Sequence, residues 1–342
     1  MAHRFSIKEI ARHAGISTAS VDRVIHNRAN VSARTRLRVG QAIAEMERQE
    51  LQIAAQGRQM FFDFVVEAPA RFAREVRVAA ETVMPQFSAA ICRPRFITQD
   101  VMTDDQVADA LDRIIKRGSH GLCLKARDTP RIRDAVNRVT AAGIPVVTLV
   151  TDITVAGRKA YVGLDNASAG RTAAFLISRV LGRASGCVLA TQSDGAFLGE
   201  EERHAAFVHE MAIRCPDLTI VTSSRGRGVH YQTTQDLRAV MGQLDGLRAV
   251  YSMGGGNRTI LSMLADHGHC ADVFVGHDLD HDNRALIDTS QIDFILHHDL
   301  TEDLRQVFAA FLAHHKVGVA GETGAVSGVQ VITPANVPAQ RR

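Results

Sequence analysis

The chain has 342 residues, of which 46% are hydrophobic and 23% are charged, a balance typical of a soluble globular protein. Its longest apolar run, residues 144–150, is far shorter than the roughly 20 residues of a membrane-spanning helix, which excludes an integral membrane protein. Five widely spaced cysteines and the absence of a secretory signal indicate reduced thiols and a cytoplasmic protein.

Positive charge is concentrated at the N-terminus. Residues 1–60 contain ten Lys and Arg against five Asp and Glu, a net charge of +5, so the rest of the chain carries −2 of the total of +3. A basic N-terminal module on a slightly acidic body is typical of a nucleic-acid-binding domain joined to a sensor.

The stretch 6–27, SIKEIARHAGISTASVDRVIHN, predicts two short helices joined by a tight turn. Ser6 and Glu9 have the spacing of a capping box, and Gly15 can adopt the left-handed conformation that ends a helix. Ser17 can cap a second helix with an apolar inner face and a polar outer face. Such a face suits the DNA major groove, although an ordinary helical hairpin with a solvated face has the same spacing.

The same stretch, followed by NVSARTRLRVGQAIAEM (residues 30–46), closely resembles the DNA-binding headpiece of the lac-repressor (LacI/GalR) family. The shared features are the turn at residues 14–17, AGIS, and the core of the recognition helix at residues 21–24, VDRV. The resemblance implies an all-α helix-turn-helix headpiece over residues 1–46 that binds double-stranded operator DNA. The residues expected to contact DNA are Ser6, Ser17, Thr18, Ala19, Ser20, Asp22, Arg23, His26, Asn27, Ser32 and Arg34.

Within this set, Thr18 and Ala19 are expected to select bases and Arg23 to make the strongest direct contact, because the start of a recognition helix faces base edges. A phosphate would repel Asp22, so that carboxylate is expected to orient Arg23, accept from a cytosine or turn aside. The arginines of residues 34–38 suit phosphates, or they belong to a solvated basic face.

Residues 47–60 are expected to form a linker. In the family this region carries a short hinge helix that folds on operator DNA and inserts a leucine into the minor groove. Ala54 and Ala55 fit that pattern, but the usual proline is absent and Gly57 stands at the position of the leucine. Glycine disfavours helix and has no side chain to insert, so the chain departs from the family here.

From residue 61 onward, short apolar segments alternate with helical patterns such as that of Val107, Leu111 and Ile114. This alternation predicts parallel sheets with helices on both faces, and eleven candidate strands are too many for one six-stranded unit. Two α/β lobes are therefore expected. The candidate strands are residues 62–66, 89–92, 121–124, 146–150, 161–164, 187–190, 219–222, 249–252, 273–276, 294–296 and 329–332.

The family's body resembles periplasmic sugar-binding proteins, with two Rossmann-like lobes and a ligand in the cleft between them. The resemblance implies a multidomain protein with such an α/β body over residues 61–342, in which the chain crosses between lobes near Gly163, Asp293 and Gly318. Lobe 1 would then contain about residues 61–163 and 293–317, and lobe 2 about residues 164–292 and 318–342.

In such folds the ligand binds beyond the carboxyl ends of the strands, where Asp, Asn and Arg side chains can form paired hydrogen bonds with sugar hydroxyls. Four of the expected residues match ligand-binding positions of the family: Asp165, Arg203, Asn257 and Asp278. For each of them, a helix cap or a surface ion pair is the alternative role. Phe72 could stack on the ligand or belong to the core, and His298 stands where the family often has glutamine. The expected ligand-binding residues are Phe72, Asp165, Arg203, Asn257, Asp278 and His298.

Two functional hypotheses follow. The first is a homodimeric transcription regulator, a repressor, that reads two symmetric DNA half-sites and responds to a sugar or polyol; it needs no cofactor, metal or membrane. The second is a sugar- or nucleoside-processing enzyme in which Asp278 pairs with His281 or His277. The headpiece favours the regulator, because an enzyme needs no helix face that recognises DNA. The histidine-rich residues 266–270 and 277–282 lack the spacing of a helical zinc site.

Overall fold

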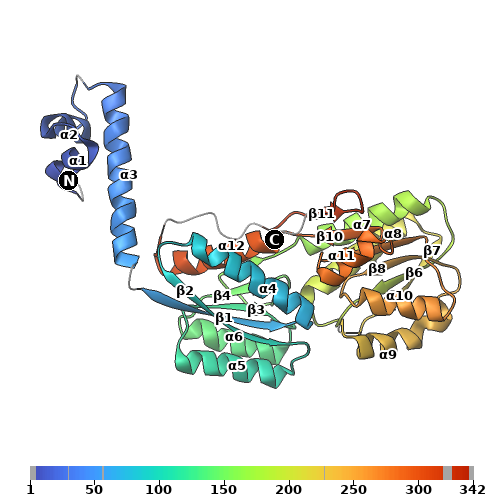
Figure 1. Cartoon of the computed structure of the whole chain (residues 1–342). Coiled ribbons are helices and arrows are strands. Elements are labelled where there is room, and N and C mark those ends of the chain that lie inside the picture. Colours follow the sequence, from blue (N-terminus) through green and yellow to red (C-terminus); the bar gives the residue numbers. More distant parts are fainter. Residues whose placement is uncertain (1–4, 30, 56–57, 227, 319–325, 339–342) are drawn as a thin grey trace. The chain divides into compact units, whose positions relative to one another are not determined.

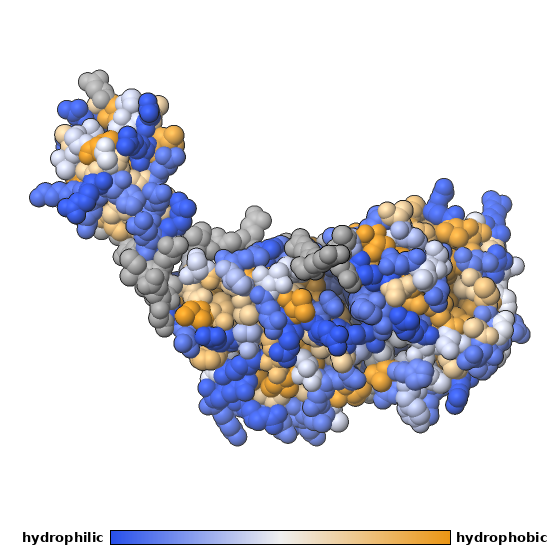
Figure 2. Space-filling model, in the orientation of Figure 1, coloured by the Kyte–Doolittle hydropathy of each residue, from blue (hydrophilic) through white to orange (hydrophobic). Residues whose placement is uncertain are grey.

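A computed structural model describes residues 5–29, 31–55, 58–226, 228–318 and 326–338 (Figure 1). The chain comprises a helical head, α1 to α3, and an α/β body, β1 to β11. None of the described helices is long and apolar enough to cross a membrane. On the face shown in Figure 2, hydrophilic and hydrophobic residues are interspersed over the body.

The head begins with the predicted helix-turn-helix. Helix α1 (Ile7–Ala14) starts at a capping box, in which the Ser6 hydroxyl accepts from the Glu9 N–H and the Glu9 carboxylate accepts from the Ser6 N–H. Gly15 ends α1 with a φ of 62°, and Ser17 caps α2 (Thr18–Ile25) by accepting from the Ser20 N–H. The small core of the head contains Ile10, Ala11, Val21 and Val39.

The third helix is longer than predicted. Helix α3 runs over Ala33–Ala55, so the expected end of this helix at residue 46 is wrong and most of the expected linker is helical. The reason is local: residues 47–55 contain neither glycine nor proline, and glutamate, glutamine, alanine and leucine all favour helix. The expected hinge residue Gly57 lies outside the described residues.

The body contains two sheets, and each of the eleven predicted strands overlaps an observed one. The second differs most: the prediction covers residues 89–92, whereas the strand runs over Ile91–Gln99. The first sheet has the order β2-β1-β3-β4-β5 and the second the order β11-β10-β9-β8-β6-β7. Strands β1, β3, β4 and β5 are parallel, as are β6 to β10, whereas β11 is antiparallel to β10. The strands are β1 (Gln59–Glu67), β2 (Ile91–Gln99), β3 (Gly121–Lys125), β4 (Val146–Leu149), β5 (Ala160–Val162), β6 (Gly186–Thr191), β7 (Leu218–Ser223), β8 (Leu247–Ser252), β9 (Val273–His277), β10 (Phe294–His297) and β11 (Gln330–Ile332).

Helices cover both faces of each sheet. Helices α4 and α12 lie on one face of the first sheet and α5 and α6 on the other; α7 and α8 cover one face of the second sheet, with α9 to α11 opposite (Figure 1). Their apolar sides and the strands between them form the cores of the two lobes. The helices are α4 (Ala70–Val83), α5 (Asp104–Arg117), α6 (Pro130–Ala141), α7 (Asn166–Leu181), α8 (Leu198–Arg214), α9 (His230–Val240), α10 (Asn257–Asp266), α11 (His281–Asp288) and α12 (Leu300–His314), with short 3-10 turns η1 (Met84–Gln86) and η2 (Met241–Gln243).

One predicted crossing between the lobes is misplaced. Strand β10 pairs with β9 in the second sheet, so the chain does not cross near Asp293 but after His297. Helix α12 then packs on the first sheet, where Phe308 and Phe311 contact the ring of Phe62. The chain first leaves that sheet after β5, close to the expected crossing at Gly163, and β11 returns it to the second sheet.

Helices α7 and α8 pack unusually closely. A methyl group on Gly170 of α7 would lie 2.1 Å from the carbonyl oxygen of Arg203 and 3.0 Å from the backbone nitrogen of Phe207, both in α8. The buried side of α7 consists mostly of small residues, while the larger Phe175 and Val180 of the same helix are 46% and 49% exposed.

We expect Gly170→Ala to destabilise the body by about 1–3 kcal/mol, because the added methyl group forces α7 and α8 apart. Gly40→Ala in α3 is the matched helical control: a methyl group at Gly40 would meet no described atom within 4 Å, so a gain of up to about 1 kcal/mol is expected from helix propensity. Urea unfolding followed by circular dichroism measures both. Equal stability of Gly170→Ala and the wild type would contradict the close packing.

Candidate functional site

The outer face of α2 is exposed and polar. Thr18, Ala19 and Arg23 all lie on the solvent side, while Val21 is fully buried against the rest of the head. Ser32 accepts from the Thr35 N–H at the start of α3. The face therefore presents short side chains at the start of a helix and one long cation a turn later, an arrangement that fits into a major groove.

Asp22 is engaged within the head. Its carboxylate lies 3.0 Å from His26 Nδ1 and 3.1 Å from an Arg28 terminal nitrogen. Asn27, with a φ of 52°, accepts from Arg36 through its side-chain oxygen. The expected alternatives for Asp22 are to orient Arg23, to accept from a cytosine or to turn aside. Its carboxylate is turned toward His26 and Arg28, and no ion pair joins it to Arg23 in the described part of the head.

The body has a cleft between its two lobes, which we call the interlobe cleft. Polar residues reach it from the carboxyl ends of strands in both sheets, the position where α/β folds bind ligands. Phe72, Phe197, His277 and the backbone of Gly254 and Gly255 also line it. Its charged residues are Glu67, Arg71, Asp100, Lys125, Glu200, Arg203, Asp278 and Asp280.

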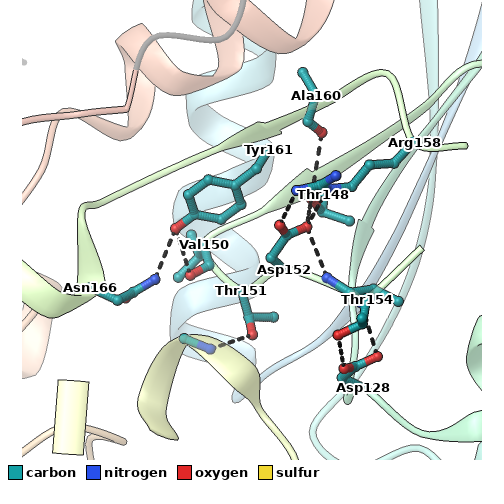
Figure 3. Close-up of polar contacts among 12 residues, drawn as sticks. Asp128, Thr148, Val150, Thr151, Asp152, Thr154, Arg158, Ala160, Tyr161 and Asn166 are labelled. Atoms are coloured by element: carbon teal, nitrogen blue, oxygen red, sulfur yellow. Dashed lines mark hydrogen bonds and ion pairs between the residues drawn. The ribbon is translucent and has the colours of Figure 1, made fainter. Parts of the chain in front are cut away.

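Direct contacts join the lobes across this cleft. Arg71 of α4 forms an ion pair with Asp280, with 2.9 Å between Nε and Oδ2, and donates to the carbonyl oxygen of Gly228. Nearer the crossings, the Thr151 hydroxyl accepts from the Gly199 N–H at 3.1 Å (Figure 3). The structure therefore shows the lobes closed on each other.

Most cleft carboxylates already have partners. Glu67 accepts from the Met102 N–H and from Arg127, and Glu200 accepts from both the backbone N–H and the hydroxyl of Ser193, at 2.6 and 2.5 Å. Asp280 caps α11 through the Asn283 N–H in addition to its ion pair with Arg71. These contacts with the protein fix the orientation of the three carboxylates.

Lys125 at the end of β3 is less well satisfied. Its ammonium group donates to the carbonyl oxygen of Glu67 at 3.1 Å and lies 4.3 Å from the centre of the Phe197 ring and 5.8 Å from that of Phe72. Burial lowers the pKa of Lys125; the nearby carboxylates of Glu200 and Glu67 oppose this shift, and the charge of Arg203 adds to it. No carboxylate lies within ion-pairing distance of this ammonium group in the described chain.

Arg203 of α8 connects the cleft to the crossing segments. It is 3% exposed and donates to the Asn166 side-chain oxygen at 2.7 Å and to the Met253 carbonyl oxygen at 3.3 Å. Asn166 in turn donates to the Tyr161 hydroxyl, which lies 3.2 Å from the Val150 carbonyl oxygen (Figure 3). The same hydroxyl lies 2.8 Å from the carbonyl oxygen of Leu164. This chain of hydrogen bonds runs from a cleft cation to the point where the chain first changes lobe.

A second buried network contains Asp278 and His298. Asp278 has a φ of 63°, an uncommon backbone conformation for aspartate, and its carboxylate lies 3.5 Å from His298 Nε2. The other ring nitrogen of His298 lies 2.5 Å from Asp303, which also accepts from the Ser327 hydroxyl. Burial raises the pKa of Asp278, but the interactions with His298 outweigh it and hold that pKa well below its usual range. His298 therefore stands between two carboxylates at the second crossing.

The charge of His298 gives a testable pH dependence. Burial lowers its pKa, but hydrogen bonds to Asp278 and Asp303 outweigh burial and raise the pKa to about 9, against about 6.5 for an unfolded histidine. Stability from this proton is therefore fully present below pH 6.5 and is lost as the pH rises toward 9. We expect the melting temperature of the wild type to fall over this range.

His298→Gln should melt at a lower temperature at pH 6.5 and show a smaller decline between pH 6.5 and 9. His281→Gln is the matched control, because the His281 side chain is 81% exposed and should leave the wild-type pH profile unchanged. Thermal unfolding at constant ionic strength measures all three proteins. Parallel declines in wild type and His298→Gln would show that another group titrates.

Comparison with known families assigns both parts of the chain. Residues 6–47 match the model of bacterial regulatory proteins of the lacI family, and residues 76–314 match that of the periplasmic binding protein domain. The chain belongs to the lacI family of regulators. Its body is a periplasmic binding protein domain, and the predicted resemblance is confirmed in both parts.

Solved structures similar to this lacI-family chain agree with the two-lobe fold. A glucose-galactose binding protein, GanP, from Geobacillus stearothermophilus has 17% identity and a TM-score of 0.70, covering 82% of this chain and 99% of its own. A solute binding protein from Burkholderia graminis in complex with D-arabinose has 16% identity and a TM-score of 0.72, covering 84% and 99%. One from Agrobacterium vitis with bound D-fucose has 17% identity and a TM-score of 0.71, covering 81% and 96%. Curated proteins give no match.

The ligand-binding residues expected for this lacI-family regulator do not all reach the cleft. Phe72, Arg203 and Asp278 line it, whereas His298 is not part of the lining and lies 3.5 Å from Asp278. Asp165 is exposed and caps α7 through the Ser168 N–H, while its neighbour Asn166 holds Arg203. Asn257 is buried and donates to Asn283, which itself lines the cleft.

Several cleft residues fall outside the prediction: Glu67, Arg71, Lys125, Glu200 and Asp280. Glu67 and Lys125 are the last residues of β1 and β3, so the strand-end rule identifies them when it is applied to every strand. Arg71 and Glu200 lie in the first turns of α4 and α8 among other charged residues, and no sequence signal separates them.

The catalytic pairing of the enzyme hypothesis is not formed. His281 is directed to solvent and lies 3.8 Å from Asp282, and His277 contacts the Tyr251 hydroxyl at 2.8 Å. Neither forms an ion pair with Asp278 in the described chain. Among the residues that the structure describes, no three His, Cys, Asp or Glu side chains are grouped to hold a metal.

Proposed function

We propose that this protein is a cytoplasmic, homodimeric repressor whose operator affinity is controlled by a sugar or polyol bound in the interlobe cleft. The observation that supports it most strongly is the union, in one chain, of a lacI-type head with a two-lobe body that closes over a polar cleft. Related folds with bound D-arabinose and D-fucose support a sugar as the ligand class.

The mechanism follows from the position of the cleft. A ligand held by Arg203 of one lobe and by residues of the other favours the closed arrangement, because only that arrangement offers both sets of contacts. Closure alters the geometry of the segments that leave the body toward the heads of the dimer. The ligand can then change operator affinity by its differential affinity for the two arrangements, typically about 1–3 kcal/mol.

We propose a homodimer because one head of this size contacts a single half-site, and two symmetric heads gain specificity from two half-sites. We propose that the contact between protomers is made mainly by the bodies. Sedimentation of the purified full-length protein at micromolar concentration should give a dimer. A monomer that stays monomeric on DNA would contradict this part of the proposal.

The whole proposal is tested by two steps in sequence. First, operator sequences are selected from a random duplex library with the full-length protein, and affinity is measured by fluorescence anisotropy. Second, sugars and polyols that raise the melting temperature are added to the operator complex. Ligand-dependent operator affinity supports the proposal, whereas affinity indifferent to every bound small molecule would refute it.

A further inference from the structure

The hydrogen bonds of the interlobe cleft are unevenly distributed between acids and cations. Glu67, Glu200 and Asp280 each accept at least two hydrogen bonds or ion pairs from the protein. In contrast, Lys125 uses one of its three N–H donors, and one terminal nitrogen of Arg203 donates to no described residue, while both side chains line the cleft. The spare N–H donors of the cleft therefore include those of Lys125 and of one terminal nitrogen of Arg203.

Neither cation forms an ion pair with a carboxylate in the described chain. Within the described chain no carboxylate lies within 4 Å of Lys125 or Arg203, although both are enclosed, and Arg203 is only 3% exposed. A buried charge without a partner is costly, and two such charges facing one cavity also repel each other. A negatively charged group between them would relieve both costs.

The two cations come from different lobes. Lys125 ends β3 in the first sheet, and Arg203 lies in α8 against the second sheet. Phe197, at the start of α8, packs over the Lys125 ammonium group at 4.3 Å, so the closed arrangement places the lysine against the other lobe. An anion bound by both would hold the two lobes together.

The size of the negative charge is limited by the rest of the cleft. Five carboxylates line it, from Glu67, Asp100, Glu200, Asp278 and Asp280, against the three cations Arg71, Lys125 and Arg203. A dianion such as a phosphate ester would be repelled by these carboxylates. A single carboxylate carries only one negative charge, and it would meet the two cations that form no ion pair, Lys125 and Arg203. The remaining lone pairs of the fixed carboxylates can still accept from hydroxyl groups.

We propose that the effector is a polyhydroxylated carboxylic acid, a sugar acid, whose carboxylate is bound between Lys125 and Arg203. This inference rests on the proposed function, since it specifies the ligand class of the same cleft. It makes Lys125 the residue that distinguishes an acid from the corresponding neutral sugar or alditol.

The test uses the full-length protein and pairs of compounds that differ in the carboxylate. Isothermal titration calorimetry compares D-gluconate with D-glucitol, D-galacturonate with D-galactose and D-xylonate with xylitol, with D-glucose 6-phosphate as the dianionic probe. We expect at least one acid to bind about 10- to 100-fold more tightly than its neutral partner, the range of a charge-assisted hydrogen bond.

Lys125→Met should remove most of this preference, and Lys125→Arg should keep part of it. Methionine keeps an unbranched chain of nearly the same length without the ammonium group. Removing a buried unpaired charge should not unfold the protein, which the melting temperature checks. Lys116→Met is the matched control, because Lys116 is an exposed lysine of the same lobe. Unchanged acid preference in Lys125→Met would overturn the proposal.

The remaining outcomes separate this inference from the function on which it rests. Neutral sugars that bind as tightly as the acids and alter operator affinity would overturn the sugar-acid assignment and leave the sugar-controlled regulator intact. Preference for D-glucose 6-phosphate would also overturn it. Binding of no acid, neutral sugar or alditol would refute both the sugar acid and the proposed sugar or polyol effector.

Discussion

Arg203→Ala is expected to abolish the effect of the ligand on operator binding while leaving operator affinity without ligand close to that of the wild type. Arg203 lies in the body, so its loss removes no residue of the DNA-binding face. It lines the cleft with one terminal nitrogen that donates to no described residue, so the ligand should lose a charge-assisted hydrogen bond. The loss of ligand affinity should be about 10- to 150-fold.

The response should fail for a second reason, because Arg203 is the first member of the chain of hydrogen bonds through Asn166 and Tyr161 to the first crossing. Tyr161→Phe separates binding from transmission. The Tyr161→Phe variant keeps the hydrogen bond from Arg203 to Asn166, so its affinity for the ligand should stay within about threefold of the wild type. The effect of the ligand on operator affinity should nevertheless fall. Anisotropy titrations of operator with and without saturating ligand measure the coupling.

Two variants make this result interpretable. Arg214→Ala removes an arginine from the same helix that forms an i,i+4 ion pair with Glu210. Neither residue lines the cleft, so this variant should respond as wild type. Asp278→Asn removes a second cleft charge and should also abolish the response. A normal ligand response in Arg203→Ala or Asp278→Asn would mean that the effector binds elsewhere.

Coupling must also be reciprocal, which gives an independent check. If ligand weakens operator binding by a given factor, operator DNA must weaken ligand binding by the same factor. Calorimetric titration of the ligand into the protein with and without saturating operator measures the second factor. Unequal factors in the wild type would show that a further equilibrium, such as dimer dissociation, is linked to binding.

The existence of the elements could be predicted because it depends on local pattern. All eleven strands and the helix-turn-helix are signalled by apolar periodicity, caps and Gly15, all of which act within a few residues. The sheet to which a strand belongs is not local. Strand β10 pairs with β9 rather than joining the first sheet, and only the packing of α12 on Phe62 shows where the chain crosses.

The candidate site could be predicted only in part, for a related reason. The family pattern indicates which positions face a cleft, but one residue of register decides whether a side chain caps a helix or enters the site, as Asp165 and Asn166 show. Lysine is usually exposed, so residue type alone does not place Lys125 in a cleft. Its enclosure depends on Phe197, which reaches it from the other lobe.

Arg23→Ala is expected to weaken binding to the selected operator by about 1–3 kcal/mol, that is, about 5- to 150-fold, and to relax the preference at one base pair. Arg23 is exposed on α2 about one turn after the short residues Thr18 and Ala19, and an arginine there can reach the O6 and N7 atoms of a guanine. The neighbouring Asp22 is already paired with His26 and Arg28, so it does not hold Arg23 away from DNA.

Arg34→Ala is the matched control, since it removes the same charge from an exposed position at the start of α3. It should weaken all duplexes by a similar factor and reduce the salt dependence of binding by about one phosphate contact, because charge at that position orients the head without reading bases. Arg23→Ala should instead weaken the selected operator more than a duplex of random sequence. If both variants lose affinity equally on every sequence, Arg23 contacts only the phosphate backbone, and specificity must come from Thr18 and Ala19 with the shape of the DNA.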